Sequence, residues 1–188
     1  MLAGYGLGET SDRKIAAALN EFKSKMPDEK LTSFLKAVED SGIEVKLGSG
    51  LSEIEPGLVG LIKFGDKPEP KSSTVFIDKD VEPDDLFFYL AHEVGHHFMH
   101  YVSGQEIPQF RNRSRNYIHL FKQLPREEQE ADVFAYNLLM PEDKIRSTYE
   151  ILRNTHGDKT DRIISELSDY FFTGKEFVIA RLQYLGIA

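Results

Sequence analysis

Two histidines that lie four positions apart, His92 and His96, constrain the fold of this chain more than any other feature of its sequence. Residues 83–101 are predicted to form a helix, because two aspartates follow Pro83 and apolar residues then recur at helical spacing. Positions i and i+4 of a helix lie on the same face, one turn apart. Two imidazoles placed in this way can bind one metal ion, at about 2.0–2.1 Å if that ion is zinc.

Glu93, which directly follows His92, is the candidate catalytic residue. It is rotated from His92 by about 100° around the helix axis, so its carboxylate can reach a water on the metal without binding the metal itself. Such a carboxylate can accept the proton of a metal-activated water. The alternative is a surface glutamate on an amphipathic helix, but the position of the motif after an apolar run favours the metal site.

A catalytic zinc ion takes three protein ligands and keeps one position open. His100 lies on the same helical face, but about 12 Å along the axis from His92, so an unbroken helix cannot bring all three histidines to one ion. The chain has no cysteine. We therefore expect the third ligand to come from another element and to be a histidine or a carboxylate.

Glu128 is the predicted third ligand. It lies in the first turn of a helix predicted for residues 125–140, and Asp132 follows on the same face one turn later. Asp132 can accept the free ring N–H of a ligating histidine and so fix its tautomer. Glu127 and Glu130 point elsewhere and are expected to be solvated. The alternative for Glu128 is an acidic helix start that the helix dipole favours.

Small residues predict that these two helices pack closely together. Ala131 and Ala135 lie on the same side of their helix as Glu128, and Gly95 lies beside His96. Side chains of this size let two helix backbones approach, and the approach would carry the carboxylate to the two imidazoles.

The remaining periodicity predicts an α+β fold with a small three-stranded sheet and a mostly helical C-terminal part. We expect a first domain over residues 1–141, with N-terminal helices at 10–41, the sheet at 42–78, the metal helix at 83–101 and the third-ligand helix at 125–140, followed by a helix-turn-helix-like module at 142–188. Residues 58–64 and 74–77 are the expected exposed edge of the sheet, where a substrate strand could add, and residues 104–115 are expected to be irregular.

Charge and hydropathy narrow the functional classes. The net charge of −8 is not typical of a polyanion binder, so we do not expect direct nucleic-acid binding. No apolar run approaches the roughly 20 residues of a membrane span, and no signal peptide is recognisable, so a cytoplasmic location is expected. A basic stretch, Arg111, Arg113 and Arg115, could contact an acidic substrate segment or be a solvated loop.

Two motifs together carry a family resemblance. The pattern His-Glu-x-Gly-His-x-x-x-His occupies residues 92–100, and Glu-x-Glu-Ala-Asp-x-Phe-Ala-x-x-Leu-Leu-Met-Pro occupies residues 128–141. The chain resembles the ImmA/IrrE family of zinc metallopeptidases over roughly residues 42–141. The resemblance implies a gluzincin-like site with one zinc ion per chain on a minimal zincin-like α+β scaffold.

The resemblance also implies a substrate class. Characterised members of the family cleave helix-turn-helix repressors of mobile elements or stress regulons, and others are paired with antitoxin-like regulators. The implied activity is site-specific cleavage of such a partner; the alternative is a zinc-containing module that docks the partner without cleaving it. Candidates for a second oxyanion donor are His119, Tyr101 and Tyr136, and the sequence does not choose among them.

Overall fold

The computed structural model of this chain describes residues 7–28, 30–54, 56–110 and 123–187. The fold is α+β, as the sequence predicted. The helices are α1 (Glu9–Lys23), α2 (Leu31–Asp40), α3 (Leu51–Ile54), α4 (Pro83–His100), α6 (Arg126–Leu139), α7 (Glu142–His156), α8 (Thr160–Phe171) and α9 (Lys175–Tyr184). The strands are β1 (Ile43–Gly48), β2 (Leu58–Phe64), β3 (Ser73–Asp78) and β4 (Glu106–Phe110).

The described sheet has the strand order β1-β3-β2-β4, with β1 parallel to β3 and the other pairs antiparallel. Three of these strands are the expected ones. The fourth, β4, forms where an irregular segment was expected, because its backbone pairs with β2 without an alternating apolar pattern. Pro108 in β4 cannot donate a backbone hydrogen bond, and the edge of a sheet tolerates such a residue.

The prediction of which strands form the edge of the sheet is wrong. Residues 58–64 and 74–77 belong to β2 and β3, and both strands lie in the interior of the sheet. The edges of the described sheet are β1 and β4, because β1 pairs alongside β3 and β4 pairs alongside β2. A peptide strand that adds to this sheet would therefore have to pair with β1 or β4.

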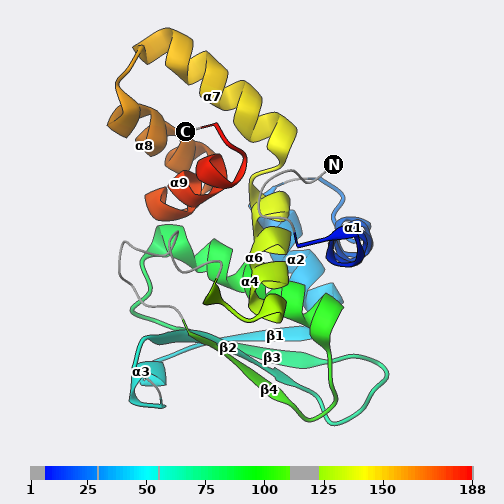
Figure 1. Ribbon diagram of the computed structural model, residues 1–188. Helices are drawn as coiled ribbons and strands as arrows, with labels where there is room; N and C mark the ends of the chain where they lie inside the picture. The colour runs from blue at the N-terminus through cyan, green and yellow to red at the C-terminus, as the bar shows by residue number, and fades with distance from the viewer. Residues whose placement is uncertain (1–6, 29, 55, 111–122, 188) are drawn as a thin grey trace.

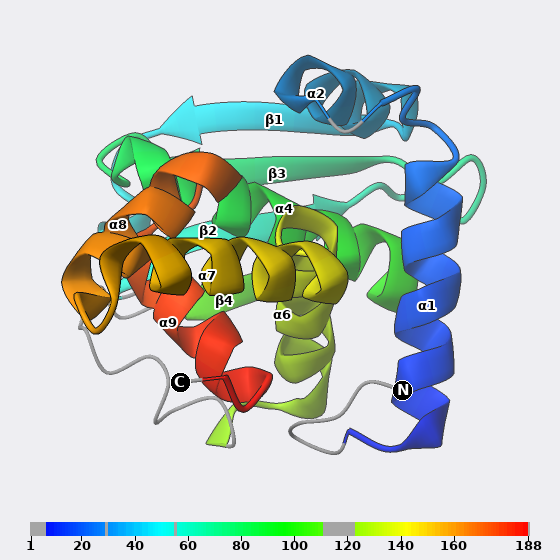
Figure 2. The same cartoon turned by 90° about the horizontal axis from the view of Figure 1, so that it is seen from above.

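Except for the short α3, which lies beside one end of the strands, the helices are stacked in layers on one face of the sheet (Figure 1). Helix α4 lies directly against the sheet, and α6 crosses α4 on the side away from the strands. Helix α1 contacts both α4 and α6, whereas α2 contacts β1. Seen from above, α1 runs along one end of this stack, and α7, α8 and α9 lie nearest the viewer, on the side of α4 that faces away from the sheet (Figure 2).

A cluster of aromatic rings joins the N-terminal helices to this stack. The ring of Phe22 in α1 lies 5.8 Å from that of Phe34 in α2, 5.6 Å from Phe98 in α4 and 6.3 Å from Phe134 in α6. These contacts are edge-on, which is a favoured arrangement for aromatic pairs. Because Phe22 is fully buried, it fixes α1 against the two central helices.

The last helix, α9, is fixed by a buried arginine and an aromatic stack. The rings of Phe88 and Phe177 are stacked at 3.9 Å. Arg181 is fully buried and donates hydrogen bonds to the Met140 carbonyl at 3.2 Å and to Asn137 Oδ1 at 2.9 Å. Burial lowers the pKa of Arg181 to about 10, so the side chain stays charged at neutral pH. The division of the chain at residue 141 into two domains stays a prediction.

The hydropathy of the helices bears on whether the chain could cross a membrane. None of the helices in the described part of the chain combines the length and the apolar character that a membrane crossing needs.

Replacement of Phe22 by alanine should lower the free energy of unfolding by about 3–5 kcal/mol, because it empties a buried site that four helices share. Urea unfolding followed by circular dichroism measures the change. The control is Ile151→Ala on the exposed face of α7, where the side chain is 65% exposed and the expected change is within about 0.5 kcal/mol. Equal losses in the two variants would contradict the packing described for Phe22.

Candidate metal centre

The site is built on the close contact between α4 and α6. A Cβ atom at Gly95 would lie 3.1 Å from Cδ1 of Phe134 and 3.3 Å from Cα of Ala131, which is tighter than an ordinary van der Waals contact. Ala131 and Ala135 are fully buried in the same contact. The absence of side-chain atoms at Gly95 therefore lets the two backbones approach, and the ligand side chains on the two helices can meet.

Three donor atoms converge between these helices. The Nε2 atoms of His92 and His96 lie 3.0 Å apart, and the Glu128 carboxylate lies 3.1 Å from Nε2 of His92 and 3.2 Å from Nε2 of His96. Both imidazoles are fully buried, and the Glu128 side chain is 12% exposed. Among the described residues, these three form the group of histidine and acidic side chains that could hold a metal ion.

The geometry of this group fits a tetrahedral ion. Ligand atoms about 2.0–2.1 Å from a tetrahedral zinc ion lie about 3.3–3.4 Å from one another. The two Nε2 atoms are 3.0 Å apart, and each lies at a similar distance from one oxygen of the Glu128 carboxylate, Oε2 at 3.1 Å from His92 and Oε1 at 3.2 Å from His96. The chemistry agrees, since two imidazole nitrogens and a carboxylate oxygen are electron-pair donors that a cation between them would hold together.

Asp132 holds the outer side of the first imidazole. Its Oδ1 atom lies 2.7 Å from Nδ1 of His92, and both side chains are fully buried. A carboxylate can only accept here, so Nδ1 of His92 carries the hydrogen and Nε2 presents its lone pair toward Glu128 and His96. This contact is of the kind that orients a metal-binding histidine.

The electrostatics keep the donors in the forms that bind metal. Burial lowers the pKa of His96 to about 4, so the ring is neutral at pH 7. Burial alone would raise the pKa of Glu128, but its contacts with His92 and His96 outweigh burial and hold the pKa well below its usual range. A neutral imidazole and an ionised carboxylate are the protonation states that ligation requires.

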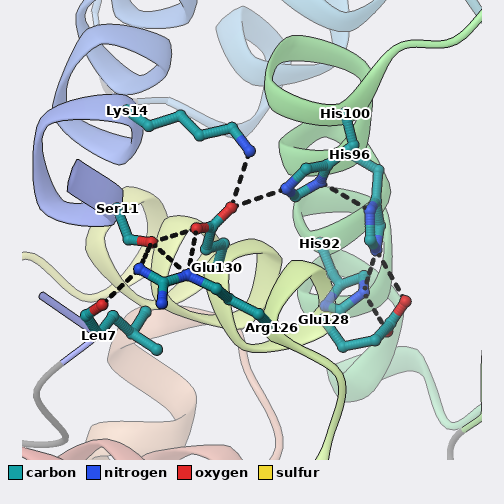
Figure 3. A network of polar contacts seen from close by, with 9 residues as sticks. All are labelled: Leu7, Ser11, Lys14, His92, His96, His100, Arg126, Glu128 and Glu130. Atoms are coloured by element: carbon teal, nitrogen blue, oxygen red, sulfur yellow. Dashed lines mark hydrogen bonds and ion pairs between the residues drawn. The ribbon is translucent and has the colours of Figure 1, made fainter.

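Glu130 is not solvated, which corrects the expectation from the sequence. It is 4% exposed and lies in a polar network between α1, α4 and α6 (Figure 3). Its carboxylate lies 2.9 Å from Nε2 of His100 and 2.8 Å from Nζ of Lys14, and it also accepts a hydrogen bond from Ser11. The expectation failed because α1, which is distant in sequence, covers this side of α6.

Glu93 and His97 lie on α4 beside the two ligand candidates. Glu93 is fully buried, between His92 and Val94 in sequence. His97 points toward the sheet, where its Nδ1 lies 2.7 Å from the Ser73 hydroxyl, and burial lowers its pKa to about 4. His97 therefore lies on a different face of the helix from His92 and His96, because each residue is rotated by about 100° from the one before it.

The candidates for a second oxyanion donor are dispersed. The Tyr101 hydroxyl lies 3.0 Å from the carbonyl oxygen of Gly65 and 2.7 Å from that of Lys67, in the loop after β2, and these two acceptors share its one hydrogen. Tyr136 is buried, with its ring 5.0 Å from that of Phe88 and 6.5 Å from that of Tyr184. Four other predicted site residues lie outside the described residues: Arg111, Arg113, Arg115 and His119.

The comparison with family models decides the identity. The model of the IrrE N-terminal-like domain, Peptidase M78, matches residues 59–183, which is more than half of the chain. The chain belongs to this family. A comparison with curated proteins finds no match.

The Peptidase M78 match covers both helices that carry the donor atoms. It begins in β2 and runs through α4 and α6 into the last turn of α9. The family is one of metallopeptidases, and the group formed by His92, His96 and Glu128 is compatible with a metal site. The match does not include α1, α2 or β1, although α1 supplies side chains to the network around Glu130.

Replacement of Gly95 by valine should separate α4 from α6. The new side chain meets Phe134 and the backbone of Ala131, so we expect a loss of about 1–3 kcal/mol in the free energy of unfolding and weaker metal binding. Thermal unfolding and zinc titration measure the two effects. The matched control is Gly48→Val, where a Cβ meets nothing within 4 Å. A Gly95→Val protein that binds zinc normally would contradict the close approach.

Removal of the Glu128 carboxylate should weaken zinc binding by more than about 100-fold, because loss of a ligand exceeds the usual effect of an outer contact. Glu128→Ala is compared with Glu127→Ala, which removes the exposed neighbouring carboxylate. Competition with a chromophoric chelator measures the dissociation constants. The native protein is expected to bind about one zinc ion per chain, and equal affinity in the two variants would remove Glu128 from the ligand set.

Proposed function

We propose that this chain is a zinc-dependent endopeptidase that uses His92, His96 and Glu128 as ligands and Glu93 as the general base. The observation that carries the proposal is the convergence of the three donor atoms, all within 4.8 Å of one another. Membership of a metallopeptidase family supports the same reaction class.

Zinc is the metal that suits this donor set. Two imidazoles and one carboxylate are a ligand set of catalytic zinc sites, and a fourth position then remains for water or substrate. A bound zinc ion would polarise the scissile carbonyl and make a water molecule acidic enough to react at neutral pH. The neutral His96 and the ionised Glu128 need no loss of a proton before they bind it.

The role of Glu93 follows from its place on the helix. It neighbours His92 in sequence, but it is rotated about 100° around the axis, so it stands beside the ligands rather than among them. From there its carboxylate can take a proton from the attacking water and give it to the departing amine. A site that only binds metal has no chemical use for this carboxylate, which favours a catalytic function over a docking module.

A transcriptional repressor or an antitoxin-like protein with a helix-turn-helix is the proposed substrate. The proposal comes from the family resemblance and the two sequence motifs. Cleavage of such a partner would derepress a mobile element or a stress response. A substrate of this kind would place the enzyme in the cytoplasm.

The test is incubation of the zinc-loaded protein with the purified product of the neighbouring regulator gene. A discrete cut, located by mass spectrometry, is expected from the native protein. Glu93→Gln should reduce cleavage by at least about 100-fold, because it removes the base while keeping the size of the side chain. Zinc binding by this variant should be unchanged.

The matched control is Glu39→Gln, the same change at an exposed position of α2, which should cleave normally. A native protein that binds zinc and binds the partner without cutting it would contradict the peptidase proposal. That outcome would instead favour the non-cleaving regulatory module. Cleavage by Glu93→Gln at the native rate would remove Glu93 as the base.

A further inference from the structure

The Nδ1 atoms of the two candidate ligand histidines, His92 and His96, have different hydrogen-bond partners. His92 is held directly by a carboxylate, Asp132. His96 is held by another imidazole, since its Nδ1 lies 3.0 Å from Nδ1 of His100, and Nε2 of His100 lies 2.9 Å from the Glu130 carboxylate. Each ligand imidazole is therefore linked to a buried carboxylate, in one case through an intervening ring.

The hydrogen bonds of this second link run in one direction. Glu130 can only accept, so Nε2 of His100 carries a hydrogen and donates it. A neutral His100 then has a lone pair on Nδ1, which accepts from Nδ1 of His96. With its hydrogen on Nδ1, His96 presents the lone pair of Nε2 toward Glu128 and His92, where a metal ligand needs it.

Glu130 is in turn positioned by α1 and by the start of α6 (Figure 3). Lys14 forms an ion pair with it at 2.8 Å, and Ser11 donates a hydrogen bond to its other oxygen. Arg126 contacts both Glu130, at 3.3 Å, and the Ser11 hydroxyl, and its guanidinium also donates to the Leu7 carbonyl at 2.6 Å. The carboxylate thus has one fixed position, set mainly by side chains from α1.

We propose that α1 is part of the metal centre, and that Lys14 and Ser11, acting through Glu130 and His100, are positioning residues for His96. The inference rests on the proposed metal binding by His92, His96 and Glu128. It adds a contribution from residues 7–14, which lie before the segment that matches the family. His100, which is too far along the helix to be a third ligand, acquires a role as the link between a ligand and this helix.

The physical effect is on the orientation of one ring. Without His100, the imidazole of His96 loses the acceptor that holds its hydrogen on Nδ1, so the ring can adopt the other tautomer or rotate away. Loss of such an outer contact typically weakens metal binding about 10- to 100-fold. The ligand atoms themselves are untouched, so the stoichiometry of binding should not change.

The principal experiment compares His100→Leu with His100→Gln in the full chain. Leucine fills space without hydrogen bonding, whereas the glutamine amide can accept from His96 and donate to Glu130. We expect His100→Leu to weaken zinc binding about 10- to 100-fold and to change the visible absorption of the cobalt-substituted protein, and His100→Gln to recover most of both. The melting temperature of the metal-free protein separates this effect from a loss of stability.

A second pair of variants tests α1 itself and does not depend on how His100→Leu folds. Lys14→Met removes the cation from a side chain that is 38% exposed, and we expect zinc affinity to fall about 2- to 10-fold. The control is Arg13→Met, which removes a cation from the adjacent position, where the side chain is 76% exposed and pairs with Glu9. This control should bind zinc as the native protein does.

The outcomes separate the inference from the proposed function. A native protein that binds no zinc would overturn both. Tight zinc binding by the native protein, together with native affinity in His100→Leu and Lys14→Met, would overturn only the role of α1. Recovery in His100→Gln would support the link from His96 to Glu130, and a loss in Lys14→Met that Arg13→Met does not show would support the role of α1.

Discussion

The separation between α4 and α6 sets the distances between the donor atoms of the candidate metal centre. Neither helix can supply the site alone, since two donors lie on α4 and the third lies on α6. Gly95 facing Ala131 lets the backbones approach closely, and the two imidazoles and the Glu128 carboxylate meet at about 3 Å. Phe22 of α1 packs against both helices, and Phe177 of α9 stacks on Phe88 of α4, so neighbouring helices support this contact from two sides.

Burial of polar groups is the second constraint on this region. Four titratable side chains, His92, Glu93, His96 and Asp132, are fully buried in the middle of α4 and α6. Such groups are costly to remove from water unless they are paired. The Nδ1 hydrogens of His92 and His96 point outward, toward Asp132 and His100, and the Nε2 lone pairs of the two rings point inward. The inward-facing atoms of His92 and His96 are therefore electron-pair donors, which is the arrangement that a cation stabilises.

Local sequence predicted the parts of the site that depend on helical spacing. The pairing of His92 with His96, and of Glu128 with Asp132, follows from the i, i+4 rule, and the small residues beside them indicated the close approach. The strands β2 and β3 were also predicted, but their neighbours in the sheet were not, because strand order depends on contacts that local patterns do not encode. Glu130 was misjudged for the same reason: its burial depends on α1, more than a hundred positions earlier in the chain.

The elements α1, α2 and β1 lie outside the segment that matches the family model, but they complete the sheet and the core. The segment that the family model recognises starts at residue 59, yet β1 closes one side of β3, and Phe22 fills the space between Phe98 and Phe134. A chain that began at residue 59 would expose the edge of β3 and the apolar site between Phe98 and Phe134. Exposed strand edges and exposed apolar surfaces both promote self-association. We therefore expect the unit that folds independently to include α1, α2 and β1 in addition to the segment that matches the family model.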